Sequence, residues 1–367
     1  MEAGDILIKT LILFILLLTI VISLHELGHL IAAKIFGVYC QEYSIGMGPK
    51  IWSYKGKETE YSLRAIPIGG FVAMAGDDSN SLETSVDDSK IPVERTLKGI
   101  AVWKRIIIML AGVTMNMLLA IFIYSMVILS TGAYVTGTKP IVASLIENSP
   151  AEKVGIKEGD IINKIGFENG MVISPETYSE LVSFISTYDG NGPWTIEVER
   201  DSEKITYQFE PEYRADEERY VMGIVFSEKA IEVVEVNIFN CFIYGFKYTM
   251  FILRMTIASL ATLLQGKNLN SLSGPIGIYS TVAETAALGF DYYVSLVAMI
   301  SVNLALINVL PLPVLDGGRV LLLLIEVIIG HPLSKKSEEM IMNASVILLL
   351  ILVFFVTYND ISRLIGG

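Results

Sequence analysis

The sequence has few of the side chains from which soluble enzymes usually build their sites. Its 367 residues include only two cysteines and three histidines, and charged residues make up 18% of the chain. Cys40 and Cys241 show neither metal-ligand spacing nor the pattern of a disulfide framework, so we interpret them as two unpaired thiols. The formal net charge is −12. Such a chain gains nothing from releasing the counterions of a phosphate backbone, which argues against nucleic acid as a partner.

Apolar sequence, by contrast, is abundant. Hydrophobic residues make up 52% of the chain and the mean hydropathy is +0.55, which is too apolar for a soluble enzyme of this length. About 20 residues of helix cross a bilayer. The stretches that are long enough are Ile6–Lys34, Ile106–Thr131, Tyr293 onward through "NVLPLPVLDGG", and Ile341–Thr357. We expect the first to be retained as a span, because acidic residues precede it and no small-residue cleavage site follows, unlike in a signal peptide.

Lysine and arginine residues orient these spans, because cytoplasmic loops carry an excess of them. Lys98, Lys104 and Arg105 precede the second span. Lys335–Lys336 separates the third span from the fourth, so we expect both of these ends to be cytoplasmic. The N-terminus and the region between the second and third spans are then outside. If a further apolar stretch, Phe239–Gln265, also crossed the membrane, the Lys335–Lys336 loop would lie outside. This stretch is therefore predicted to be an amphipathic helix on the outer surface.

The region from about residue 139 to 226 is predicted to be a soluble outer domain. It contains short alternating strands such as "WTIEVER" and "KITYQFE". The segment "SPAEKVGIKEGDIINKIG", Ser149 to Gly166, predicts a short helix, two glycine turns and a strand. It resembles a PDZ domain of the bacterial protease type, which implies capture of a peptide as an added strand. The alternative is a domain without a ligand that acts as a steric filter over the membrane.

Two kinds of sequence lie between the first two spans. Val38–Ala75 reads as β-hairpins, two short strand-like pairs interrupted by Gly46, Gly48, Pro49 and Gly69–Gly70. Asp77–Glu94 is polar and acidic, and is predicted to be a mobile loop.

The first span ends in an unusual group, "HELGH", His25 to His29. Residues four apart lie on one face of a helix, so both imidazoles point the same way. They make half of a tetrahedral zinc site, and Glu26 on the adjoining flank can accept a proton from water. The alternative is a histidine pair satisfied by backbone carbonyls. Ionisable groups inside a span are costly and usually functional, which favours the metal site.

Zinc needs a third protein ligand and an open position for water. We predict Asp316, because an isolated aspartate in otherwise apolar sequence is expensive unless it binds a cation. Pro311 and Pro313 must interrupt the helix before it, and Gly317–Gly318 allow a tight turn after it. The remaining histidine, His331, falls in the loop predicted to be cytoplasmic. The alternative for Asp316 is a helix-capping or turn aspartate.

These motifs resemble those of the site-2 protease family of intramembrane metalloproteases, in particular the bacterial regulator-of-sigma-E protease type, here with one PDZ domain. The likeness runs nearly end to end. "HELGH" matches the zinc motif and "NVLPLPVLDGG" matches the family's N-x-x-P-x-x-x-L-D-G. The segments "YSIGMGP", "PIGGFVAMAG" and "LSGPIGI" follow in the family's order.

The resemblance implies a role for each matched residue. His25, His29 and Asp316 would bind one Zn²⁺ per chain, and Glu26 would be the catalytic acid and base. Asn308 would hold or polarise the substrate near the metal, and the hairpin segment around Tyr43–Tyr54 would pair with an unwound substrate strand. The expected substrate-binding residues are Asn308, Tyr43, Gly46, Gly48 and Pro311.

Two positions depart from the family's usual pattern. Val113 in "AGVTMN" stands where proline is common, which affects the local helix shape rather than the chemistry; Asn116 is retained. Arg319 stands where many relatives carry histidine, so a histidine there is not required as a ligand.

The predicted fold is a polytopic α-helical membrane protein of about four transmembrane helices, with a membrane-associated β-hairpin region and one extracytoplasmic PDZ domain. The predicted divisions are residues 1–37 (first span), 38–97 (hairpins and loop), 98–131 (second span), 132–232 (PDZ domain), 233–290 (outer helix and "SGPIG"), 291–330 (third span region) and 331–367 (cytoplasmic loop and fourth span).

The predicted function is zinc-dependent hydrolysis of peptide bonds inside the transmembrane helix of a single-pass membrane protein, in a bacterial inner membrane and toward its cytoplasmic side. Anti-sigma factors, membrane-bound regulators and remnant signal peptides all fit as substrates. A catalytically silent scaffold that recruits partners through the PDZ domain and a zinc transporter are the competing hypotheses. Both predict that Glu26→Gln leaves function largely unharmed.

Overall fold

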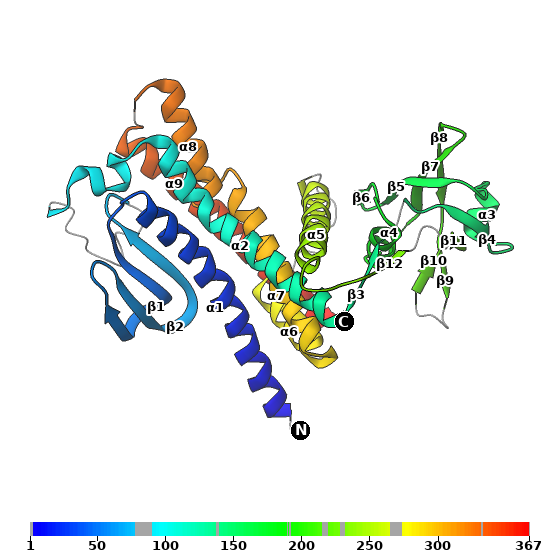
Figure 1. The fold of residues 1–367 in the computed structure, drawn as a ribbon, viewed down its shortest axis with the longest axis horizontal. Coiled ribbons are helices and arrows are strands. Elements are labelled where there is room, and N and C mark those ends of the chain that lie inside the picture. The colour runs from blue at the N-terminus through cyan, green and yellow to red at the C-terminus, as the bar shows by residue number, and fades with distance from the viewer. Residues whose placement is uncertain are drawn as a thin grey trace. The chain divides into compact units, whose positions relative to one another are not determined.

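The computed structural model describes residues 3–77, 90–136, 139–188, 190, 192–214, 219–227, 232–264, 274–331 and 333–366. The chain divides into two compact units (Figure 1). The helical unit comprises Met1–Ile123 and Leu272–Gly367, and the strand-rich unit comprises Tyr124–Ser271. Most of the predicted mobile loop, residues 78–89, lies outside the described residues.

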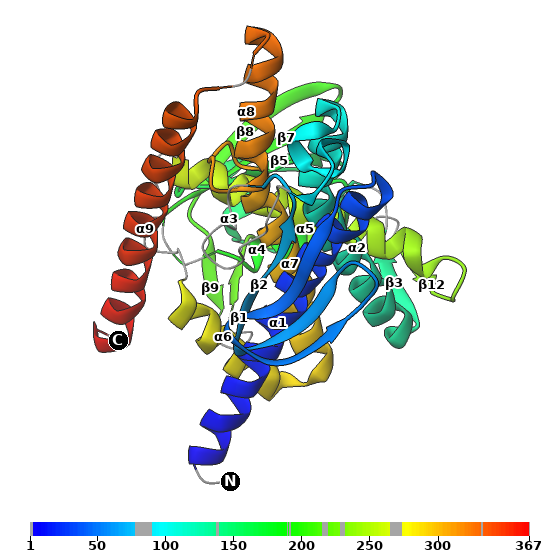
Figure 2. The same ribbon diagram turned by 90° about the vertical axis from the view of Figure 1, so that its left-hand side faces the viewer.

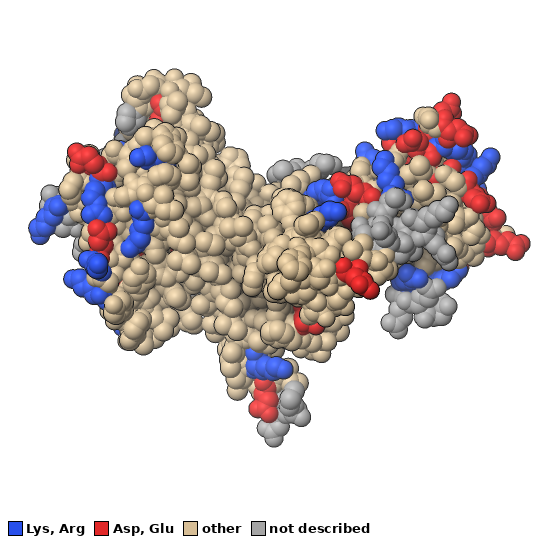
Figure 3. All heavy atoms as spheres, in the orientation of Figure 1, with Lys and Arg blue, Asp and Glu red and all other residues tan. Residues whose placement is uncertain are grey.

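Long apolar helices dominate the helical unit. They are α1 (Ala3–Ile35), α2 (Val102–Thr131), α6 (Pro275–Leu288), α7 (Phe290–Val309), α8 (Asp316–Ile329) and α9 (Lys335–Gly366). Among the described residues, α1, α2, α7 and α9 are long and apolar enough to cross a membrane, and they fall in the predicted stretches. Two 3-10 turns, Val93–Arg95 and Leu97–Gly99, precede α2. In Figure 3 the visible face of these helices carries few charged side chains, which gather mainly at the end where the hairpin lies.

The third apolar stretch is interrupted where its two prolines predict a break. Helix α7 ends at Val309, and α8 begins at Asp316 after a break that contains both prolines. The expected region 291–330 is therefore two helices, because proline has no amide hydrogen for the helix and clashes with the preceding turn. The "GPIG" sequence starts a further helix, α6, that the sequence reading did not predict; its Val282 packs with Leu17 of α1 and Leu296 of α7.

The predicted hairpins form one long hairpin folded back on itself. Strand β1 (Cys40–Lys55) pairs with β2 (Glu60–Met74). Residues 42–45 pair with 70–73 on one side and with 60–63 on the other, and 60–64 also pair with 50–55. The fold-back occurs at Gly46 and Gly48, whose φ angles of 85° and 81° favour glycine. Figure 2 shows this hairpin crossing α1, against which it packs through the cluster that contains Leu30 and Val72.

A buried carboxylate holds the rows of this hairpin together. Glu42 is 2% exposed and accepts hydrogen bonds from Ser62 Oγ at 2.5 Å and Arg64 Nη2 at 2.9 Å. Lys50 Nζ lies 3.0 Å from its other oxygen, and Arg64 also donates to the Gly48 carbonyl at 2.7 Å. Burial alone would raise the pKa of Glu42, but the hydrogen bonds from Ser62, Lys50 and Arg64 hold it below its ordinary value.

The strand-rich unit contains a domain with its own core. Its four-stranded sheet has the order β6 (Val172–Ile173), β5 (Ile161–Phe167), β7 (Trp194–Arg200) and β8 (Glu203–Phe209). Strand β4 (Val142–Leu145) pairs with β11 (Ile224–Phe226), β9 (Glu212–Arg214) with β10 (Arg219–Val221), and β3 (Ala133–Thr136) with β12 (Glu232–Glu235). The helices are α3 (Pro150–Val154) and α4 (Tyr178–Ile185). Trp194, Phe184 and Phe167 lie in the core.

The local prediction for Ser149–Gly166 is confirmed at the level of secondary structure. Ser149 caps α3, Gly155 ends it with a φ of 95°, and Gly159 makes the second turn before β5. The assignment of this domain to the PDZ type stays a prediction.

Helix α5 (Cys241–Leu264) occupies most of the stretch predicted to be an amphipathic helix. Its Arg254 forms ion pairs with Glu176 and Glu180, beside and on α4, and Met255 packs against the domain core. The charge in the middle of this apolar helix is therefore paired within the strand-rich unit. Its position on the membrane surface stays a prediction.

Candidate metal centre

Helix α1 carries two histidines on one face, as their spacing predicts. His25 and His29 are both 6% exposed, and their Nε2 atoms lie 3.2 Å apart. The rings meet edge to face with centroids 4.8 Å apart. Four residues span about one helical turn, so the helix brings both side chains to the same side, with Cβ atoms about 5–6 Å apart.

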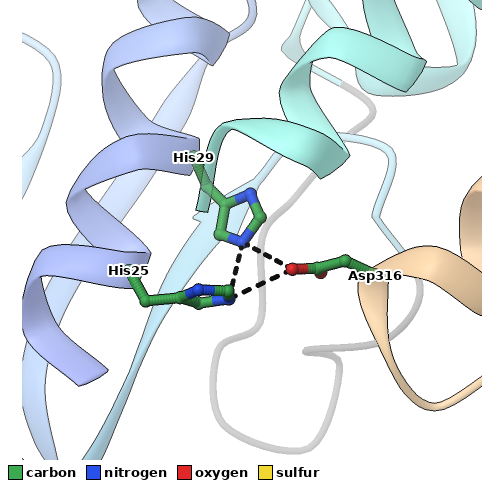
Figure 4. A group of neighbouring side chains, drawn as sticks. All are labelled: His25, His29 and Asp316. Carbon is green, nitrogen blue, oxygen red and sulfur yellow. Dashed lines mark hydrogen bonds and ion pairs between the residues drawn. The ribbon is translucent and has the colours of Figure 1, made fainter. Parts of the chain in front are cut away.

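Asp316 is the first residue of α8, and its carboxylate meets both imidazoles (Figure 4). Its Oδ2 lies 3.1 Å from His25 Nε2 and 3.3 Å from His29 Nε2. Two glycines allow this approach. A Cβ on Gly317 would come within 2.1 Å of the Val309 carbonyl oxygen, and one on Gly318 within 2.1 Å of the Leu312 carbonyl. Only residues without a side chain let the start of α8 lie so close to the end of α7.

The three atoms fit a tetrahedral zinc ion. With bonds of about 2.0–2.1 Å, two ligands of a tetrahedral zinc are about 3.3 Å apart, and the observed separations are 3.1, 3.2 and 3.3 Å. Asp316 Oδ2 is buried and makes no hydrogen bond within the described ranges, which a cation between the three atoms would compensate. Of the groups of histidine, cysteine and acidic side chains in the described chain, this one is placed to hold a metal ion, and it does not include His331.

Helix α2 contacts the second ring nitrogen, Nδ1, of both histidines, which was not predicted from the sequence. The Ile108 carbonyl accepts a hydrogen bond from His29 Nδ1 at 2.8 Å. Asn116 Nδ2 lies 3.4 Å from His25 Nδ1. Between them, a Cβ on Gly112 would lie 2.4 Å from His29 Nε2 and 2.6 Å from His25 Cε1. A lone glycine and a lone asparagine four residues apart in an apolar span are the signal that points to this role.

The other predicted residues lie at different places. Asn308, in the last turn of α7, reaches the cluster, with Nδ2 3.3 Å from His25 Nε2. Tyr43 is buried and donates its hydroxyl hydrogen to the Ser23 carbonyl at 2.8 Å, which ties the hairpin to α1. No described contact joins Gly46, Gly48 or Pro311 to the cluster; the glycines lie at the hairpin fold-back and the proline between α7 and α8.

The catalytic candidate Glu26 lies on the flank of α1 that faces the hairpin. Its Cγ is 3.6 Å from the position that a Cβ on Gly70 would take. Gly70 belongs to an outer row of the hairpin, since residues 70–73 pair with 42–45.

The two positions that depart from the family pattern have the following surroundings. Helix α2 continues without interruption through Val113. Arg319, one turn after Asp316, lies 3.5 Å from Asp77. Both line a cavity of about 470 Å³ bounded by α2, α8 and α9. Its wall includes Met109, next to the Ile108 carbonyl that holds His29.

Two imidazoles and a carboxylate that converge inside apolar helices, with a second carboxylate beside them, define a membrane metallopeptidase. Comparison with known proteins agrees. Residues 13–352 match the model of peptidase family M50, and the chain belongs to this family. The assignment to the site-2 protease family is thereby confirmed, whereas the match does not show a PDZ domain.

Curated relatives cover almost the whole chain. The regulator of sigma-W protease RasP of Bacillus subtilis is 29% identical over 97% of this chain and 99% of its own length. A putative zinc metalloprotease of Clostridium acetobutylicum is 34% identical over 95% of this chain and 96% of its own. A putative zinc metalloprotease of Agrobacterium fabrum is 31% identical over 100% of this chain and 99% of its own length.

Proposed function

We propose that this membrane metalloprotease binds one Zn²⁺ through His25, His29 and Asp316 and cleaves peptide bonds inside the transmembrane helix of a single-pass membrane protein. The observation that carries the proposal is the set of three ligand atoms, 3.1–3.3 Å apart, between the apolar helix α1 and the start of α8. The names of the relatives, zinc metalloprotease and regulator of sigma-W protease, support the metal and a regulatory role.

Glu26 is the acid and base of the proposed reaction. Zinc bound here would lower the pKa of a water molecule to near neutrality and polarise the substrate carbonyl. The Glu26 carboxylate takes the proton from the attacking water and delivers it to the leaving amine. In the proposed reaction the Asn308 amide, which lies 3.3 Å from His25 Nε2, donates a hydrogen bond to the carbonyl oxygen on which negative charge develops.

The substrate helix must unwind locally, because its internal hydrogen bonds protect its carbonyls. An unwound segment is extended and can add to a sheet edge as a further strand. Residues 42–45 are paired on both sides, so the backbone of Tyr43 is already used, and Gly46 and Gly48 shape the fold-back. We therefore place the substrate strand at an edge of this hairpin segment and not along residues 42–45 themselves.

The orientation of the protein is part of the proposal. The N-terminus and residues 132–232 face outside a bacterial inner membrane, and the site lies toward the cytoplasm, as the lysine and arginine distribution predicts. A cavity of about 550 Å³ between α4 and β11 is lined by aromatic side chains, including Tyr178, Tyr188 and Phe226. It suits an apolar peptide; a purely steric role of this domain is the alternative.

Cleavage of a model transmembrane substrate by detergent-purified protein tests the proposal. We compare wild type with Glu26→Gln and, as a matched control, with Glu284→Gln in α6, where the side chain is exposed. Wild type and Glu284→Gln should cleave and hold about one zinc per chain. Glu26→Gln should keep the zinc and lose about 100-fold or more in rate. Equal cleavage by Glu26→Gln would refute the assigned chemistry. Wild type without zinc after metal-replete purification would refute the zinc site and favour the scaffold hypothesis.

A further inference from the structure

Helix α2 presents three consecutive turns to the histidine pair. Ile108, Gly112 and Asn116 are spaced by four residues, so they share one face of the helix. The Ile108 carbonyl faces His29 Nδ1, Gly112 leaves space for both rings, and the Asn116 side chain faces His25 Nδ1. The i, i+4 pair on α1 is thus matched by an i, i+4, i+8 series on α2.

The contact to His29 fixes which of its nitrogens carries hydrogen. A peptide carbonyl can only accept, so Nδ1 of His29 must be the donor in the 2.8 Å hydrogen bond to Ile108. In the neutral ring, Nε2 then has its lone pair free, and this is the atom that lies 3.3 Å from Asp316 Oδ2. The main chain of α2 therefore prepares His29 as a ligand.

His25 needs the same tautomer, because its Nε2 also converges on Asp316. Its Nδ1 faces the Asn116 amide at 3.4 Å, and this amide can present either an acceptor or a donor. With Nδ2 toward the ring, Nδ1 would be the acceptor and the hydrogen of a neutral ring would sit on Nε2, where it blocks a metal. With Oδ1 toward the ring, Nδ1 donates and Nε2 is free.

The surroundings of the Asn116 side chain allow both orientations of the amide. Asn116 is completely buried, and in the orientation with Nδ2 toward His25 its Oδ1 has no hydrogen-bond partner among the described residues. A half-turn of the amide lets this oxygen accept the Nδ1 hydrogen of His25 and moves Nδ2 to the position that Oδ1 occupied. The tautomer that His25 needs as a ligand therefore selects this orientation. The backbone at this position is fixed as well, since Ser301 Oγ of α7 donates to the Asn116 carbonyl at 2.9 Å.

We propose that Asn116 is a positioning residue that accepts the Nδ1 hydrogen of His25 and thereby holds the Nε2 lone pair of His25 toward the metal position. The inference rests on the proposed zinc site and adds a determinant of its affinity. Hydrogen-bond partners of ligating histidines typically contribute 10–100-fold to metal affinity, so Asn116 is expected to do the same.

The test is zinc affinity of the full-length, detergent-purified chain, measured by competition with a chromophoric chelator. Asn116→Leu removes the acceptor at nearly constant volume and should weaken zinc binding by about 10–100-fold. Asn116→Asp keeps an acceptor oxygen and should bind zinc about as tightly as wild type. Thr114→Val, an exposed position on the same helix whose hydroxyl bonds to its own helix, is the control and should have no effect.

A second readout separates positioning from a general packing defect. The chain has only three histidines, so ¹⁵N-histidine spectra of the zinc-loaded protein are simple to assign. The hydrogen-bonded Nδ1–H signal of His25 should shift in Asn116→Leu and persist in Asn116→Asp. The signal of His29, held by the Ile108 carbonyl, should stay in place in both variants and serves as internal reference.

The outcomes are distinct. Wild-type affinity in Asn116→Leu, or an Asn116→Asp variant as weak as Asn116→Leu, overturns the inference while the zinc site stands. If Asn116→Leu does not fold, Asn116→Asp decides: tight zinc binding with the His25 signal retained supports the acceptor role, and loss of either overturns it. A wild-type chain that binds no zinc defeats the proposed function instead.

Discussion

Replacing Gly112 by alanine should disrupt the metal site without destabilising the fold. A Cβ at this position would lie 2.4 Å from His29 Nε2 and 2.6 and 2.8 Å from two atoms of His25, whereas ordinary carbon contacts are about 3.5 Å or longer. The imidazoles or the helix must therefore move by about 1 Å, and a metal site tolerates only about 0.2 Å in its ligand distances. Alanine is otherwise better than glycine inside a helix by about 1 kcal/mol.

We therefore expect Gly112→Ala to fold and to lose the metal site. Zinc per chain after gel filtration should fall well below one, and cleavage of a transmembrane substrate should fall by about 100-fold or more, the effect of a 1 Å misplacement. Thermal unfolding of the metal-free protein should change little. Gly4→Ala in α1 is the matched control, because nothing lies within 4 Å of its Cβ position. Stoichiometric zinc together with wild-type cleavage in Gly112→Ala would refute the role given to α2.

Three further predictions concern other parts of the chain. The pKa of Glu42 lies below its ordinary value of 4.5, so the unfolded chain protonates this group first as the pH falls. Wild type should therefore be more stable than Glu42→Gln above about pH 4.5. In thermal unfolding measured over a pH series, this difference should shrink below that pH. A Glu42→Gln curve parallel to wild type would contradict this. Arg200→Gln leaves the completely buried Asp160 without its 2.7 Å partner and should destabilise the strand-rich unit by about 3 kcal/mol in denaturant unfolding; an unchanged midpoint argues against it. Asn308→Ala should keep zinc and lower kcat by about 100-fold, and a change in KM alone would assign Asn308 to binding.

The sequence was sufficient where one physical rule dominates. Long apolar runs predicted the positions of α1, α2, α7 and α9, because a helix is the simplest way to satisfy the backbone of a span inside a bilayer. Helix α9 extends beyond the predicted Ile341–Thr357 at both ends. The helical period predicted that His25 and His29 share a face. Asp316 was predicted as a ligand because an isolated carboxylate in apolar sequence is unfavourable unless it binds a cation. The structure brings it within 3.3 Å of both imidazoles.

The parts that escaped prediction depend on contacts between distant segments. Nothing in the local pattern of Val38–Ala75 indicates that residues 42–45 pair on two sides, since this follows from the fold-back and from the buried Glu42. Helix α6 begins at Pro275, a first-turn position that proline favours, but the glycines on either side of "PI" indicate a turn. A lone asparagine in the apolar sequence of α2 is a signal, but its contact with His25 depends on how α2 packs against α1.

The difference between the supports of the two histidines has a consequence for mutational robustness. His29 is held by a peptide carbonyl, which every amino acid at position 108 supplies. His25 is held by a side chain, and few substitutions at position 116 keep an oxygen of similar reach. The two ligands are equivalent in the motif, but the hydrogen-bond partner of His29 is a main-chain carbonyl, which an amino-acid substitution does not remove. In random mutagenesis, substitutions that remove the hydrogen-bond partner of a ligand should therefore be found at position 116, beside His25, and not at position 108, beside His29.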